Sequence, residues 1–167
     1  MEIKTIAPFL KYFDNIRERT MRVARCIPAD KINWTFASGK FTLGDLLRHI
    51  AVVERYMFAE NIQNRQSRYV THGAELAADY ESILTLMQRL HAESMDIFAK
   101  LTDEDLLRKC TNPGGGEIAV NKWLRAMVEH EIHHRGQIYL YLAMIGVPTP
   151  PLYGLTSEEV RSRSRAE

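Results

Sequence analysis

Three histidines fall within five residues in the stretch HEIHHRGQ, residues 130–137. Each residue of a helix turns the chain by about 100°, so His130 and His134 share one face and lie one turn apart. Two imidazoles at this spacing can bind one metal ion, with Zn–N distances of about 2.0–2.1 Å. The alternative is two core histidines, but each would bring two polar nitrogens that need buried partners. The spacing therefore favours a metal site.

A metal site needs a third ligand, and the chain has six histidines. His49 follows a leucine-rich turn and shares a helical face with apolar residues, so it is the best candidate. His133 lies to the other side of His130 and is interpreted as a surface or outer residue. His72 stands in a loop beside a glycine, and His91 is interpreted as a buried histidine bonded to a neighbour. The predicted metal ligands are therefore His49, His130 and His134.

The same stretch also matches H-E-x-x-H, in which Glu131 would be the general base of a zinc protease. No histidine follows His134, and Glu158 or Glu159 would have to supply a third ligand. Helix geometry turns Glu131 away from the mean direction of the histidine pair. A metallohydrolase of this type is kept as an alternative.

Four long amphipathic segments must position these histidines. Apolar residues recur at helical spacing, strand alternation is absent, and polar connections separate the segments. Thr42 in TLGD is a predicted helix cap, and Gly146 a predicted helix end. Shorter helices are expected near 102–110 and 157–167, the latter ending in a frayed tail. The sequence predicts one all-α domain, 1–167, with a four-helix core at about 3–27, 42–62, 74–101 and 119–145.

Composition excludes several classes. The 167 residues are 46% hydrophobic and 26% charged, and the net charge of +1 gives no reason to expect nucleic acid as a partner. No apolar run reaches the roughly 20 residues of a membrane span. The N-terminal stretch lacks a signal-peptide layout, and two distant cysteines suit a reducing compartment. Cytoplasmic residence is the expectation.

Three stretches resemble the DinB/YfiT-like family of metal-dependent four-helix bundles. They are FTLGDLLRHIAVVE, EHEIHHRGQIYLYLAMIGV and PPLYG, in the family's order and spacing. The resemblance implies an up-down-down-up bundle and a homodimer. Carried over by position, it places three metal-binding histidines at His49, His130 and His134. Some relatives are transferases or isomerases that use a low-molecular-weight thiol, which implies such a cofactor here.

A three-histidine site leaves a fourth position of a divalent ion open, which is typical of catalytic sites. Imidazole ligands suit zinc or nickel, with iron as a further option. Gln137, Tyr56 and Tyr141 share the faces of the histidines and are candidates, with Glu131, for catalytic roles; ordinary packing is the alternative. We expect a metal-dependent enzyme acting on a small molecule, with thiol transfer preferred over hydrolysis. A non-catalytic metal-binding module is the other class.

Overall fold

The computed structural model describes residues 2–164 of the chain. Its helices and strands are α1 (Ile6–Ala24), α2 (Leu43–Val53), α3 (Ala59–Ile62), α4 (Tyr80–Phe98), β1 (Lys109–Thr111), β2 (Glu117–Ala119), α5 (Val120–Met144) and α6 (Ser157–Arg163). A wide π-type turn, Glu54–Phe58, joins α2 to α3 without a break, so the two form one long rod.

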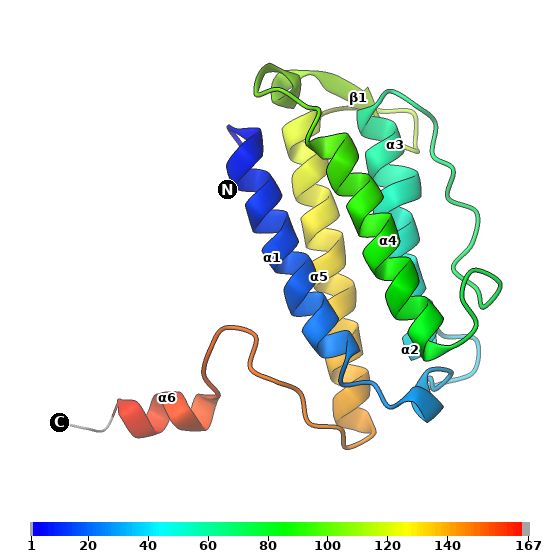
Figure 1. Ribbon diagram of the computed structural model, residues 1–167, viewed down its shortest axis with the longest axis vertical. Helices are drawn as coiled ribbons and strands as arrows, with labels where there is room; N and C mark the ends of the chain where they lie inside the picture. Colours follow the sequence, from blue (N-terminus) through cyan, green and yellow to red (C-terminus); the bar gives the residue numbers. More distant parts are fainter. Residues whose placement is uncertain (1, 165–167) are drawn as a thin grey trace.

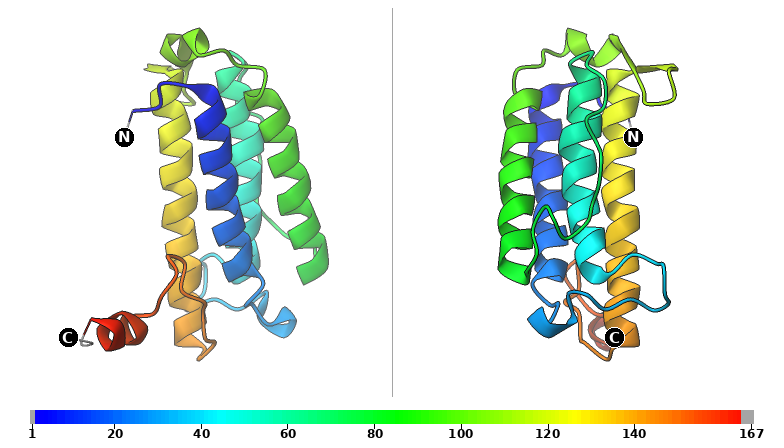
Figure 2. Two further views of the ribbon diagram at one scale, coloured as in Figure 1. Left: turned by 60° about the vertical axis from the view of Figure 1, so that its left-hand side comes forward. Right: turned by 90° about the vertical axis from the view of Figure 1, so that its right-hand side faces the viewer.

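The four long rods form the predicted bundle. Helices α1 and α5 run in one direction, whereas α2–α3 and α4 run in the other, which is the up-down-down-up topology (Figures 1 and 2). The rod α2–α3 packs against both α4 and α5, and α1 packs against the same two helices from the opposite side. Because α2–α3 and α4 are parallel, residues 63–79 must run back along the bundle to connect them.

Capping residues determine where the two parallel rods, α2–α3 and α4, begin. The Thr42 hydroxyl accepts the amide of Asp45 at 3.0 Å, and the Asp45 carboxylate accepts the amide of Thr42 at 2.9 Å. This confirms the cap predicted from TLGD and places His49 two turns into α2. Asp79 and Ser82 make the equivalent reciprocal cap at the start of α4.

The core consists of two clusters along the bundle, each with side chains from every rod. Near one end Phe13 of α1 packs against Phe98 of α4, with ring centroids 6.2 Å apart. Towards the other end Leu47 and Ile50 of α2, Leu90 of α4 and Ile138 of α5 are all almost fully buried. Burial of these helical stripes is the main stabilising contribution expected for such a bundle.

Two predicted helices and one predicted loop differ from the structure. The first helix is shorter than 3–27, and the third begins at Tyr80 rather than near residue 74, because the crossover needs the intervening residues as extended chain. A two-stranded antiparallel hairpin, β1–β2, replaces the loop expected around TNPGGGE. Strands of three residues are too short to produce a visible alternation of apolar and polar positions.

The C-terminal segment leaves the bundle after Gly146. This glycine has a φ of 72°, and the amide of Val147 donates to the carbonyl of Leu142 at 2.9 Å, which ends α5 as predicted. Helix α6 then projects away from the rods (Figure 1), with its Thr156 cap as expected. The tail beyond residue 164 lies outside the described residues, and the assignment of 1–167 to one domain stays a prediction. No helix within residues 2–164 is long and apolar enough to cross a membrane.

Candidate metal centre

The bundle brings His49 of α2 to the histidine pair of α5. One ring nitrogen of each of His49, His130 and His134 lies within 4.8 Å of the other two. The Nε2 atom of His130 is 3.1 Å from Nε2 of His49 and 3.1 Å from Nε2 of His134. Two nitrogens on a tetrahedral zinc ion would be separated by roughly 3.3 Å, given Zn–N distances near 2.0–2.1 Å. The cluster therefore has the dimensions of a metal site.

The helical pair is oriented from within α5. Nδ1 of His134 lies 2.7 Å from Oε1 of Gln137, and the amide nitrogen of Gln137 lies 3.2 Å from Nε2 of His133. An amide oxygen only accepts, so Nδ1 of His134 carries the proton and Nε2 is left with a lone pair. Gln137 thus orients a candidate ligand and does not itself face the cluster. The exposed His133 contacts this glutamine and lies outside the three-histidine group.

His49 is oriented from the crossover. Its Nδ1 is 3.2 Å from the hydroxyl of Tyr69, and that hydroxyl is 2.7 Å from Nδ1 of His72. Phe41 packs edge-on against His49, with ring centroids 5.3 Å apart. Sequence reasoning did not select Tyr69 or His72, because both stand in an irregular segment where helical spacing carries no information.

Electrostatics keep the cluster neutral. Burial, and then the neighbouring His134 and His49, lower the pKa of His130 from 6.5 to about 3. Burial, then His134 and His72, lowers the pKa of His49 to about 4. Burial also lowers the pKa of His134, although the hydrogen bond to Gln137 opposes this. Uncharged imidazoles are the form that binds metal ions.

The donor set fits a divalent ion. Three neutral imidazoles have one N–H each, and the proton of His134 is on Nδ1. His130 can donate from Nε2 to only one of its two close neighbours, so at least one of the two 3.1 Å nitrogen pairs has no proton between its atoms. A bound cation would satisfy all three nitrogens together. All three side chains are also partly exposed, which leaves a route from solvent.

The two candidate tyrosines have contacts of their own. The ring of Tyr141 packs against Trp34, with centroids 5.4 Å apart. The ring of Tyr56 lies under the guanidinium groups of Arg55 and Arg68. Neither tyrosine is hydrogen-bonded to a histidine of the cluster, and their catalytic roles stay a prediction.

Glu131 belongs to a buried ionic cluster on another face of α5. Its carboxylate accepts from Arg17 at 3.0 Å, and Arg17 also pairs with Glu54. Glu54 in turn accepts from Nδ1 of His91 at 3.0 Å. Glu131 is 2% exposed and paired with Arg17, so it does not face the candidate metal centre as a protease base would have to. His91 is buried and bonded to a neighbour, as predicted.

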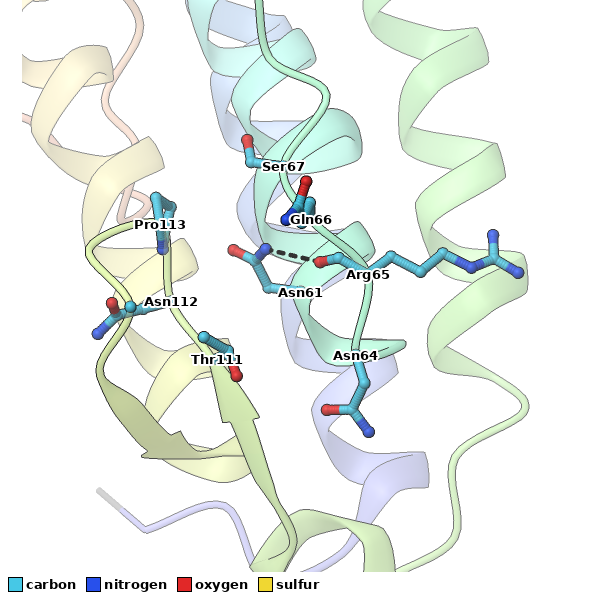
Figure 3. Close-up of a pocket in the computed structure, with 9 residues that line it drawn as sticks. Asn61, Asn64, Arg65, Gln66, Ser67, Thr111, Asn112 and Pro113 are labelled. Atoms are coloured by element: carbon cyan, nitrogen blue, oxygen red, sulfur yellow. Dashed lines mark hydrogen bonds between the residues drawn. The ribbon is translucent and has the colours of Figure 1, made fainter.

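A pocket lined mainly by polar residues lies apart from the three clustered histidines. It has a volume of about 510 Å³ and is lined by residues at the end of α3, the start of the crossover and the turn of the hairpin (Figure 3). Asn61 lies between its walls, and its amide nitrogen donates to the carbonyl of Arg65 at 3.0 Å. None of the three clustered histidines lines this pocket.

Comparison with protein families identifies the class. Residues 12–138 match the family described as the DinB superfamily. The match covers most of the chain and includes every histidine of the cluster, and the chain belongs to the DinB superfamily.

Particular relatives agree with this fold. The chain is 25% identical over 147 residues to the uncharacterized protein YjoA of Bacillus subtilis (strain 168), covering 86% of this chain and 93% of YjoA. A DinB-like protein from Bacillus cereus superposes with a TM-score of 0.77 at 19% identity, covering 89% of this chain and 97% of the other. YfiT from Bacillus subtilis is described as a probable metal-dependent hydrolase with an unusual four-helix bundle topology. It superposes with a TM-score of 0.64 at 19% identity, covering 83% of this chain and 87% of YfiT. At these identities the superpositions show the fold alone.

Proposed function

We propose that the protein is a metal-dependent enzyme that holds one divalent ion, zinc or nickel before iron, on His49, His130 and His134. One observation carries the proposal: three neutral imidazoles converge on one point from two helices, and all three are partly exposed. When bound, such an ion supplies a Lewis acid with one position open to a small nucleophile, whose pKa it lowers.

The neighbouring residues favour a thiol over water as that nucleophile. Within residues 2–164 no carboxylate is hydrogen-bonded to the three histidines, and Glu131 is paired with Arg17 instead. A site whose histidines have no hydrogen-bonded carboxylate to act as a base favours a nucleophile that loses its proton easily. A thiol has a pKa near 8.5, whereas that of water is 15.7. We therefore propose transfer of a low-molecular-weight thiol to a small electrophile.

Hydrolysis is the second candidate. YfiT, which shares the fold, is described as a probable metal-dependent hydrolase. The missing carboxylate base stands against this reaction here, because a hydrolase commonly places one within reach of the attacking water. The likeness to YfiT is the observation that keeps the reaction in consideration.

A non-catalytic, structural metal site is the alternative of a different class. Structural zinc sites are closed by four protein ligands, whereas catalytic sites keep one position open. Only three candidate ligands converge within the described part of the chain. Their partial exposure is also more typical of a site that admits a substrate.

The experiment has two stages. The purified protein is analysed for bound metal and then reloaded with zinc or nickel after chelation; about one ion per chain is expected. The loaded protein is next assayed with small electrophiles and glutathione, bacillithiol or mycothiol, in parallel with ester and amide hydrolysis. Turnover only with a thiol supports the proposal, and turnover only by hydrolysis supports the second candidate. Full metal occupancy without any turnover would support the non-catalytic module.

The expected partners are a small substrate and a second copy of the chain. Along its exposed side α5 presents Leu140 and Met144, which are 61% and 56% exposed. Pairing of this surface between two copies would bury apolar area. Sedimentation should then show a dimer that Leu140→Asp dissociates, and a monomer at all concentrations would contradict this proposal. Nucleic acid and membrane are not expected as partners.

A further inference from the structure

We propose that Tyr69 and His72 are positioning residues of the metal centre, which hold the ring of His49 in the orientation that its metal ligand role requires. The inference rests on the proposed metal site. It assigns a task to the crossover, residues 63–79, which otherwise only connects α3 to α4.

The three candidate ligands differ in how they are held. His130 and His134 lie one turn apart on a single helix, and Gln137 of the same helix orients His134. His49 stands alone on α2, and the partner of its Nδ1 atom comes from the crossover. The bond between His49 and Tyr69 therefore links the site to a segment outside α2 and α5, which the bond between His134 and Gln137 does not.

The hydrogen-bond chain can run in only one direction when the site is filled. If Nε2 of His49 is a ligand, its proton is on Nδ1 and is donated to the hydroxyl oxygen of Tyr69. That hydroxyl then donates to Nδ1 of His72, at 2.7 Å, and His72 keeps its own proton on Nε2.

The π-type turn anchors one end of this segment. Such a turn leaves carbonyl groups without their usual helical partners. The carbonyl of Tyr56 accepts the amide of Arg68 at 2.7 Å and the hydroxyl of Ser67 at 3.3 Å. The Ser67 hydroxyl also accepts the amide of Tyr69. Tyr69 is thus attached to the same rod that carries His49.

Arg48 anchors the other end. It is 1% exposed and immediately precedes His49. Its Nε donates to the carbonyl of His72 at 2.8 Å, and Nη1 donates to the carbonyl of Ala77 at 2.9 Å. The residue beside the ligand therefore fixes the backbone of the residue that ends the chain of hydrogen bonds. Two independent attachments to one rod indicate that this segment is part of the site.

The test measures zinc affinity by competition with a chromophoric chelator. Tyr69→Phe removes one hydroxyl and should weaken zinc binding by about 10–100-fold, the usual effect of losing an outer partner of a ligand. His72→Leu should weaken binding in the same direction, whereas His72→Asn should restore much of it, because its side-chain oxygen can accept from Tyr69. Tyr80→Phe is the matched control, since its hydroxyl bonds only the distant carbonyl of Ala24, and it should leave affinity unchanged.

A second measurement separates positioning from loss of fold. Nitrogen-15 NMR of the zinc-loaded protein should show His49 protonated on Nδ1 and His72 protonated on Nε2. In Tyr69→Phe, His72 should lose its preference for the tautomer with the proton on Nε2. If the unaltered protein binds zinc but Tyr69→Phe binds it equally well and leaves the His72 tautomer unchanged, the positioning role is wrong. Failure of the unaltered protein to bind any divalent ion would instead overturn the metal site itself.

Discussion

Two adjacent faces of α5 carry polar side chains that differ in exposure and in their partners. On one face His130 and His134 are partly exposed, and their Nε2 atoms meet that of His49. On the next face Glu131 and Arg135 are each 2% exposed and lie in the interior of the bundle. The four residues are consecutive pairs in sequence, so a rotation of about 100° separates the two environments.

The charges of the second face are paired within the protein itself. Arg17 from α1 pairs with Glu131 from α5 and with Glu54 from the π-type turn, and His91 from α4 bonds Glu54. Burial alone would lower the pKa of Arg17, but Glu131 and Glu54 together raise it. The cluster connects all four rods of the bundle. Removing one partner would leave an unpaired charge in a dry interior, which is costly.

The histidine face lacks such internal compensation. Its three rings have lowered pKa values and are neutral, and the outward nitrogens of His49 and His134 are bonded to Tyr69 and Gln137. Their inward nitrogens face one another. The polar groups of α5 therefore differ by face. One set is paired with oppositely charged side chains of the bundle, whereas the other set has ring nitrogens that face one another.

The largest expected effect is on the charged face. Arg17→Met leaves Glu54 and Glu131 buried without their cation, so the free energy of unfolding should fall by about 3–5 kcal/mol. Chemical denaturation measures this. The matched control is Arg25→Met, since Arg25 is exposed near the end of the same helix and should change stability by less than about 0.5 kcal/mol. Equal stability of the two variants would show that the buried cluster is not structural.

The histidine face should respond in metal binding rather than in stability. His49→Ala, His130→Ala and His134→Ala should each purify metal-poor, with affinity reduced by more than the 10–100-fold typical of an outer partner. His133→Ala should keep most of its metal, because His133 contacts only Gln137 at the edge of the site. Elemental analysis after gel filtration measures occupancy. Full occupancy in His49→Ala, or a loss in His133→Ala equal to that of the ligand variants, would contradict the assigned ligands.

A smaller effect is expected on the pH dependence of the metal-free protein. His49 and His130 have pKa values of about 4 and about 3 in the folded chain, against 6.5 as the ordinary value. The unfolded chain therefore binds more protons between these limits, so stability rises with pH there. The free energy of unfolding is therefore unreduced by these two histidines above about pH 6.5, and it decreases as the pH falls towards their folded-state pKa values of about 4 and about 3.

Urea unfolding with a chelator, at about pH 7.5 and about pH 5.5, tests this dependence. His130→Ala should show a flatter dependence than the unaltered protein, and His133→Ala should show the same one. A dependence that His130→Ala leaves unchanged would mean that this imidazole is not the group that titrates.

The smallest expected effect is on the exposed third face of α5. A Cβ at Gly136 would meet no atom within 4 Å, so the single chain has room for a larger residue there. Gly136→Ala should stabilise the helix by about 0.4–1 kcal/mol. Gly146→Ala is the contrasting variant, because a φ of 72° disfavours alanine there, and it should destabilise the protein. Thermal unfolding distinguishes the two directions, and destabilisation by Gly136→Ala would place this face in a contact with another chain.

The sequence by itself determined much of this protein. Helical periodicity predicted the four rods, local capping chemistry predicted the starts at Thr42 and Thr156, and glycine predicted the end of α5 at Gly146. The spacing of His130 and His134 placed two side chains on one face, because both lie within one turn of a single helix. These properties depend on neighbours in the chain, which is why they can be read without a fold.

Only the tertiary structure decided which face of α5 is buried. Met127 and Ile138 on the face of the histidines are buried, but so are the charged Glu131 and Arg135 on the next face. A charged residue appears exposed until its partner is known, and the partner of Glu131 is Arg17, 114 positions away. The hydrogen bond between His49 and Tyr69 could not be predicted either, because an irregular crossover has no periodicity and its contacts exist only after the rods have packed.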